Sequence, residues 1–167
     1  GFEVVAYPRH QAAYAALSQC LTRGNRRGQK GQCVLHLDDV LTLAQTAELC
    51  WLGVPPAQVE AADFRDNLAA LAAVSQNVYA LLVPLYGADD ETRFRKIAAL
   101  ASWAKADLLA SFDPLYHVAE RRAVQDVVTC IRQHVSLSEA GYRLNANAER
   151  HLKPAREAAR LFAEWPE

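Results

Sequence analysis

"LLASFDPLYHVAERRAVQDVVTCIR", residues 108–132, is the stretch on which the interpretation of the whole chain depends. A short apolar run with strand character ends at Asp113, and His117 follows four positions later. A charged turn and a long amphipathic helical pattern come next. Carboxylate and imidazole groups at the C-terminal end of a strand are typical metal ligands of α/β enzymes. Asp113 and His117 are therefore the first candidates for a metal site.

Strand-like runs alternate with helical patterns along most of the chain. Such alternation predicts an α/β fold, with βα units around a parallel sheet or barrel. No repeat or internal linker interrupts the pattern, so we expect residues 1–167 to form a single segment. The predicted strands lie near 2–7, 47–53, 77–83 and 107–112, with a further short candidate at 33–37. The predicted helices cover 9–23, 38–44, 56–75, 90–106 and 119–135, and a last one starts near Pro154.

The composition is that of an ordinary globular protein. Hydrophobic residues make up 51% of the 167 residues, charged residues 22%, and the formal net charge is -1. These values argue against a disordered chain and against a strongly basic protein that coats nucleic acid. No apolar run approaches the roughly 18 residues that span a bilayer. We therefore expect a cytoplasmic protein without a membrane partner.

Four cysteines occur without the spacing of a zinc-binding motif. We expect them to be buried, reduced thiols, as is common for free cysteine. The chain contains no methionine and opens directly on a strand-like run. This start suggests a piece of a longer protein. The four cysteines are Cys20, Cys33, Cys50 and Cys130.

The most basic stretch is "RGNRRGQKG", residues 23–31, which we expect to be a loop because it holds three glycines in nine residues. Its cations are Arg23, Arg26, Arg27 and Lys30. Glycines allow the backbone to approach a phosphate, and the four cations attract one, so the loop is the best candidate for nucleic-acid binding. The alternative is a solvated surface loop, since the aromatic residues that stack on bases are missing.

"HLDD", residues 36–39, also has the spacing of a metal site, because a histidine and an aspartate two residues apart on a strand share one face. The two aspartates, Asp38 and Asp39, precede a helical pattern. A helix cap and an acidic residue in the first helical turn explain them more simply than a metal site does, and we expect that structural role.

Three stretches together suggest a family. They are "YPRHQAAYAALSQCLTRGNRRGQKGQCVLHLDDV" at 7–40, "FDPLYHVAERRAVQDVVTCIR" at 112–132 and "LNANAERHLKPAREAARLF" at 144–162. The chain resembles the PHP (polymerase and histidinol phosphatase) domain of the bacterial C-family DNA polymerases, and most of all the error-prone relatives of the polymerase III alpha subunit. The second stretch is the most specific of the three, whereas residues 44–106 read as generic βα sequence.

The resemblance implies a distorted (β/α)7 barrel with a binuclear or trinuclear metal site at the C-terminal ends of its strands. It also implies that the strands carrying the first ligands precede Gly1, and that the polymerase palm with its magnesium-binding carboxylates follows Glu167. We therefore expect a partial barrel of parallel strands that lacks the first strands. Residues 143–167 would lead toward the polymerase core.

The metal ligands of the family are only partly matched. Leu115 stands where relatives carry the last ligand, and Tyr86 replaces a histidine expected earlier in the chain. The resemblance thus implies that Asp113 and His117 are the remains of a metal site, and that this segment binds no cofactor while the complete polymerase uses magnesium.

The leading hypothesis is a non-catalytic scaffold segment of an error-prone DNA polymerase that acts in damage tolerance. Its partners would be DNA, through the complete protein, the rest of the polymerase chain, and other DNA-synthesis proteins. Two alternatives stay open, a metal-dependent phosphoesterase of the PHP type and a non-catalytic protein-interaction module.

Overall fold

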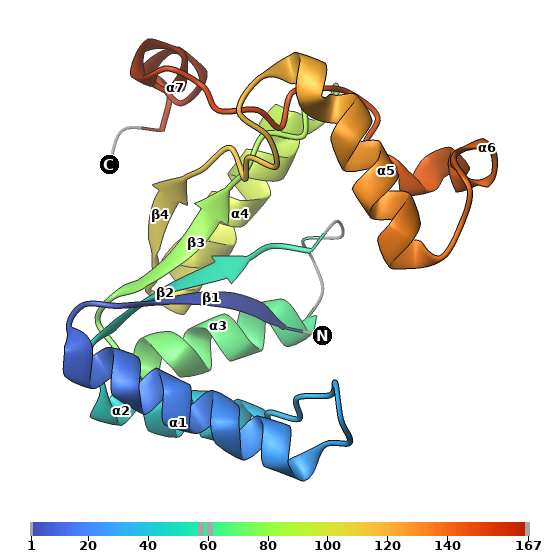
Figure 1. The fold of residues 1–167 in the computed structure, drawn as a ribbon. Coiled ribbons are helices and arrows are strands. Elements are labelled where there is room, and N and C mark those ends of the chain that lie inside the picture. The colour runs from blue at the N-terminus through green and yellow to red at the C-terminus, as the bar shows by residue number, and fades with distance from the viewer. Residues whose placement is uncertain (1, 57–58, 60–61, 166–167) are drawn as a thin grey trace. The chain divides into compact units, whose positions relative to one another are not determined.

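The computed structural model describes residues 2–56, 59 and 62–165 (Figure 1). Within these residues, seven α-helices and a four-stranded sheet form a mixed α/β structure. The chain divides into two compact units. The first unit comprises the described residues of 1–82 and 91–109, and the second comprises those of 83–90 and 110–165.

The first unit is built on the sheet, whose strand order is β1-β2-β3-β4. Trp51 of β2 lies opposite Val78 of β3, and these two strands are parallel. In β2 every second residue is buried, which is the two-residue periodicity of a strand with one face in the core. The sheet is not closed within the described residues. The strands are β1 (Glu3–Pro8), β2 (Leu49–Val54), β3 (Val78–Leu82) and β4 (Asp107–Ala110).

Four helices accompany these strands, and their apolar residues complete the core of the first unit. Phe64, Leu68 and Leu71 from one helix and Ile97 from another are at most 1% exposed. The helix between β2 and β3 makes the parallel βαβ unit that the sequence predicts. The helices are α1 (Gln11–Arg27), α2 (Leu37–Thr46), α3 (Ala62–Val74) and α4 (Asp90–Ala104).

The prediction that all four strands run parallel is wrong for β1. This strand is antiparallel to β2, with Glu3 opposite Val54 and Pro8 opposite Leu49. Two helices, α1 and α2, connect the two strands and lie side by side (Figure 1). Because the first helix carries the chain away and the second brings it back, β2 starts beside the end of β1. An even number of helices thus reverses the strand direction that one crossover helix would give.

The segment between α1 and α2 also differs from the prediction. Residues 33–37 form no strand, and α1 continues to Arg27 instead of ending at Arg23. The returning chain crosses α1 at the buried Gly24, whose carbonyl accepts a hydrogen bond of 3.0 Å from the Val34 N–H. A glycine suits this position because it has no side chain to separate the two segments.

The second unit contains the remaining helices. The helical pattern at 119–135 is confirmed, and the last helix begins directly after Pro154, as predicted. One short helix was not predicted; it follows a capping box in which the Ser136 N–H donates a hydrogen bond of 3.3 Å to the Glu139 carboxylate. The elements are η1 (Ala119–Arg121), α5 (Arg122–Gln133), α6 (Leu137–Ala140), η2 (Gly141–Arg143) and α7 (Ala155–Leu161).

The remaining sequence predictions have mixed outcomes. The helix expected at 56–75 is present as α3, although residues 57, 58, 60 and 61 lie outside the described part. All four cysteines are free, and Cys20 and Cys130 are buried. The prediction of burial is wrong for Cys33, which is exposed because residues 33–37 are not a strand in the sheet. Within the part of the chain that the structure describes, no helix has the length and hydropathy of a membrane span.

The crossing at Gly24 generates a stability prediction. A Cβ atom at this position would lie 2.6 Å from the Cys33 Sγ and 2.9 Å from two side-chain carbons of Leu35. We therefore expect Gly24→Val to lower the free energy of unfolding by about 2 kcal/mol, because overpacking at the crossing costs more than the helix gains from the higher helix propensity of valine. Urea unfolding measures this change.

Gly87→Val is the matched control, since no atom lies within 4 Å of a Cβ built at Gly87. We expect its unfolding free energy to stay within about 0.5 kcal/mol of the unaltered chain. Equal stabilities of the Gly24 and Gly87 variants would contradict the close crossing of the two segments.

Candidate functional site

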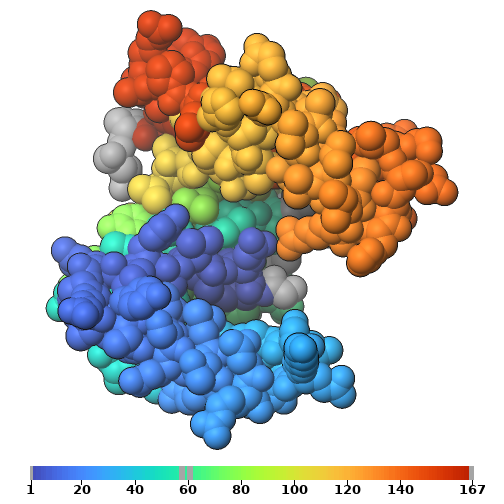
Figure 2. Space-filling model, viewed as in Figure 1, coloured from blue at the N-terminus to red at the C-terminus, as the bar shows by residue number. Residues whose placement is uncertain are grey.

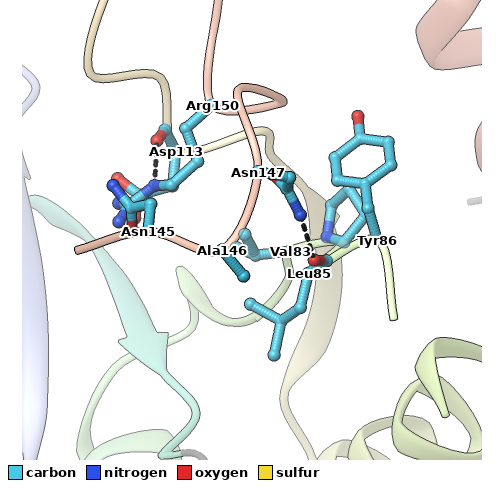
Figure 3. Close-up of a pocket in the computed structure, with 9 residues that line it drawn as sticks. Val83, Leu85, Tyr86, Asp113, Asn145, Ala146, Asn147 and Arg150 are labelled. Atoms are coloured by element: carbon cyan, nitrogen blue, oxygen red, sulfur yellow. Dashed lines mark hydrogen bonds and ion pairs between the residues drawn. The ribbon is translucent and has the colours of Figure 1, made fainter. Parts of the chain in front are cut away.

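A pocket of about 270 Å³ lies in the second unit (Figure 3). Three stretches that are far apart in the sequence line it. One directly follows β3, one follows β4, and the third precedes α7. The lining residues are Val83, Pro84, Leu85, Tyr86, Asp113, Asn145, Ala146, Asn147 and Arg150. The pocket therefore contains Asp113, the first of the two predicted metal ligands.

Asp113 is held by Arg150. The Arg150 guanidinium pairs with the Asp113 carboxylate, and its Nε donates a hydrogen bond of 3.1 Å to the Asp113 carbonyl (Figure 3). The backbone of Asp113 has a positive φ of 42°, and its N–H donates a 3.2 Å hydrogen bond to the Ser111 hydroxyl. A positive guanidinium at the carboxylate occupies the place that a metal cation would need.

The chain beyond Asp113 is tied to residues 150–152. The Leu115 N–H donates to the Arg150 carbonyl at 2.8 Å, and the Leu152 N–H donates to the Tyr116 carbonyl at 3.1 Å. Tyr116 and His151 form a parallel bridge, and Tyr116 is buried. This backbone pairing fixes the loop that follows β4 to the segment that precedes α7.

His117, the second predicted ligand, is exposed and does not line the pocket. No group of three or more histidine, cysteine, aspartate and glutamate side chains suited to a metal ion is found in the described residues. Zinc needs about four donors, and neither Asp113, which is paired with Arg150, nor a solvated imidazole supplies such a set. The two residues do not fit the metal site of the resembled family, and their vestigial nature stays a prediction.

Tyr86 lies where the family carries a histidine. Its backbone, at a φ of 57°, donates a 2.7 Å hydrogen bond to the Asp90 carboxylate, which also accepts from the Leu85 N–H at 3.2 Å. The Lys153 ammonium lies 4.9 Å from the centre of the Tyr86 ring. Burial raises the pKa of the Tyr86 phenol. The phenol is therefore protonated at neutral pH and is a poor metal ligand.

Lys153 is charged and almost fully buried, with 6% of its side chain exposed. Burial by itself lowers the pKa of Lys153. The Glu149 carboxylate and Tyr86 raise this pKa by more, so the net shift is upward. Lys153 pairs with Glu149 and lies 3.2 Å from the Nε2 of His151. Its positive charge is another unfavourable neighbour for a metal cation in this unit.

Sequence reasoning missed the contribution of residues 145–147 and Arg150 to the pocket. They belong to a mixed-charge stretch without catalytic spacing, and nothing local indicates their partners. Asn147 donates a 3.2 Å hydrogen bond to the Leu85 carbonyl, 62 residues away (Figure 3). The Asn145 carbonyl accepts one of 2.6 Å from Arg122. The segment is thus bonded both to the stretch that follows β3 and to helix α5.

The predicted nucleic-acid site lies in the first unit, and the loop expected at 23–31 is helical up to Arg27. Arg23, Arg26 and Arg27 belong to the last turns of α1, and Lys30 lies in the turn behind them. Cations at a helix C-terminus interact favourably with the helix dipole, which gives them a structural role as well. Arg23, Arg26 and Lys30 are exposed and have no ion pair in the part of the chain that the structure describes. Their contact with nucleic acid stays a prediction.

Arg27 differs from the other three cations because it pairs with Asp39. One guanidinium nitrogen donates to the Asp39 carboxylate at 2.9 Å, and the His36 N–H donates to the same carboxylate at 2.9 Å. These hydrogen bonds, that of Arg27 first, hold the pKa of Asp39 well below its usual range. The predicted helix-start role is confirmed for Asp39, but the capping residue of α2 is His36 and not Asp38.

The chain is similar to several bacterial proteins named error-prone DNA polymerase. It is 41% identical over 166 residues to the one from Rhodopseudomonas palustris (strain BisB5) and 41% identical over 167 residues to that of Sinorhizobium medicae (strain WSM419). The one from Caulobacter vibrioides (strain ATCC 19089 / CIP 103742 / CB 15) is 37% identical over 164 residues. The alignments cover 98–99% of this chain but only 15% of each relative. No protein-family model matches the chain.

The Asp113–Arg150 pair generates a prediction about metal binding. We expect the purified chain to carry less than about one zinc or manganese per chain, because a metal site needs several free donors at fixed distances. Elemental analysis after dialysis measures this ratio. Stoichiometric metal that disappears in Asp113→Ala, but stays in the matched exposed variant Asp107→Ala, would overturn the prediction.

The Arg27–Asp39 pair generates a prediction about pH. Because the folded-state pKa of Asp39 is lowered, the pair stabilises the fold fully above the unfolded-state pKa of about 3.9, and this stabilisation is lost as the pH falls through the lower folded pKa. We expect Asp39→Asn to be less stable than the unaltered chain at pH 7, and the difference to shrink below about pH 4. Thermal unfolding at several pH values measures both stabilities.

Asp38→Asn is the control, because Asp38 has no ion pair in the described residues and is exposed. A stability difference for Asp39→Asn that does not change between pH 7 and pH 3 would speak against the ion pair.

Proposed function

We propose that the chain is a non-catalytic structural segment of an error-prone DNA polymerase, corresponding to part of its PHP domain. The observation that carries the proposal is the similarity over nearly the whole chain to relatives of that name. The complete protein would extend a primer along a DNA template, with magnesium held by residues outside this chain. Damage tolerance and a cytoplasmic location belong to the same proposal.

The contacts of the second unit support a structural role. In its pocket Asp113 pairs with Arg150, and Lys153, which lies beside the pocket residue Tyr86, pairs with Glu149. Groups that are neutralised in this way hold distant parts of a chain together, but they are poorly prepared to activate water or to bind a metal. These pairings favour a structural role for the pocket over a catalytic one.

Residues 144–153 have a specific place in this proposal. The Asn147 amide and the Arg150 guanidinium hold this segment to residues 85 and 113. In the complete polymerase the segment would be the start of the connection toward the catalytic core. Fixing it at several points would set the direction in which the chain leaves the unit, since few backbone conformations satisfy all of these hydrogen bonds together.

A segment exchange tests the proposal. The matching 166 residues of the Rhodopseudomonas palustris polymerase would be replaced by this chain, and primer extension by the chimeric polymerase would be measured. We expect a rate within about tenfold of the parent enzyme, because the exchanged part supports the catalytic residues and does not supply them. The isolated 167-residue chain should show no extension above a mock preparation.

Two controls make the outcome decisive. A polymerase with a flexible glycine-serine linker in place of the segment should be at least about a hundredfold slower, since a catalytic core without its support is misplaced. Primer extension by the isolated chain would refute the non-catalytic role. A folded but inactive chimera, or a linker variant as active as the parent, would refute the supporting role.

A further inference from the structure

Helix α5 in the second unit has its apolar face turned outward. Four apolar side chains occupy positions i, i+3, i+4 and i+7, which places them on one side of the helix. They are Val124, Val127, Val128 and Ile131, with exposed fractions of 53%, 43%, 49% and 69%. We call this surface the valine face. In Figure 2, α5 and the residues after it are drawn in orange.

The other side of the helix carries the polar residues and makes the contacts within the unit. Arg122 donates a 2.6 Å hydrogen bond to the Asn145 carbonyl and pairs with Asp126 at 3.6 Å. Gln125 contacts Thr129 at 3.5 Å, and Cys130 is buried. The helix therefore packs on its own unit through polar groups, which is the reverse of the usual orientation of an amphipathic helix.

Such an orientation needs a covering surface. Valine and isoleucine have weak helix propensity, so they are poor choices for a helix face that stays in water. Contiguous exposed apolar side chains on a globular protein mark interaction sites. Polar residues at these four positions would suit a helix face that stays in water better.

The border of the valine face indicates the charge of its partner. Arg121 precedes Val124 by three residues and Arg132 follows Val128 by four, so both are neighbours of the face on the helix surface. Both arginines are exposed, and neither has an ion pair in the part of the chain that the structure describes. Glu120 is the exposed acid next to this border, which leaves an excess of positive charge.

A second copy of this chain is a poor match for the valine face. If two α5 helices paired antiparallel through it, Arg121 of one copy would approach Arg132 of the other. In a parallel pair each arginine would approach its own counterpart. Like charges at such positions destabilise helix pairing, whereas acidic side chains on a different partner would stabilise it.

We infer that the valine face of α5 is a docking surface for an apolar segment with acidic borders, supplied by the part of the polymerase chain outside these 167 residues. This inference rests on the proposed function. The aligned region is only 15% of each relative, so most of the polymerase chain is available as the source of such a segment. Docking inside one polypeptide also needs no strong affinity, because the effective concentration of the two surfaces is high.

Labelling of an introduced thiol tests the inference. Val124→Cys would be made in a Cys33→Ser background, both in the isolated chain and in the chimeric polymerase, and the labelled site would be read by tandem mass spectrometry. We expect the thiol at position 124 to react with a maleimide at least about tenfold more slowly in the polymerase, because docking closes access to it. Gln133→Cys, on the opposite side of the same helix, should react equally in both proteins.

Charge variants test the border. Arg121→Glu together with Arg132→Glu in the chimeric polymerase should raise the labelling rate at position 124 by at least about threefold, while the double lysine variant should not. If the labelling rate at position 124 rises equally in the double glutamate and the double lysine variant, the electrostatic part of the inference is overturned.

The outcomes separate this inference from the proposed function. Equal labelling at position 124 in both proteins would overturn the docking surface, even if the chimera extends primers. Protection in an inactive chimera would support docking and refute the supporting role. Slow labelling in the isolated chain would also overturn the inference, and sedimentation would tell whether a second copy causes it.

Discussion

The organisation of the second unit depends on the pairing of residues 113–116 with residues 150–152. The Asp113–Arg150 ion pair and the hydrogen bonds at Leu115 and Leu152 close a loop of more than thirty residues. Loop closure costs conformational entropy, which grows only slowly with loop length, so a few cooperating bonds are enough to hold it. The same pairing bears on the chemistry, because it places a guanidinium at the carboxylate that a metal ion would need.

Local periodicity was sufficient to predict most elements of the fold, but not the direction of one strand. The apolar run of β2 and the three-and-four spacing of apolar residues in α3 and α4 are properties of each segment alone. The direction of β1 instead depends on how many helices separate it from β2, and residues 33–37 resemble a strand closely enough to disturb that count. Gly24 offered a signal, since a glycine inside a helical pattern often marks a close crossing, but glycine is equally common where a helix ends.

The candidate sites were predictable only as far as they are local. The position of Asp113 after β4 follows from the sequence, and so does the helix-start role of Asp39. Their partners do not, since Arg150 lies 37 residues from Asp113 and Arg27 lies 12 residues from Asp39, on other elements. A pattern in one segment cannot indicate whether a distant guanidinium neutralises a carboxylate, although that decides between a metal ligand and a structural ion pair.

Helix α5 shows the same limit of local patterns for an interaction surface. Its heptad-like spacing of valine and isoleucine predicts an amphipathic helix, but periodicity alone does not indicate which side faces the helix's own unit. The hydrogen bond from Arg122 to Asn145 settles that question, because it fixes the polar side inward. A helix held in this way is stable in the second unit and still has its apolar side free. Its stability and its interaction surface thus come from opposite sides of the same twelve residues.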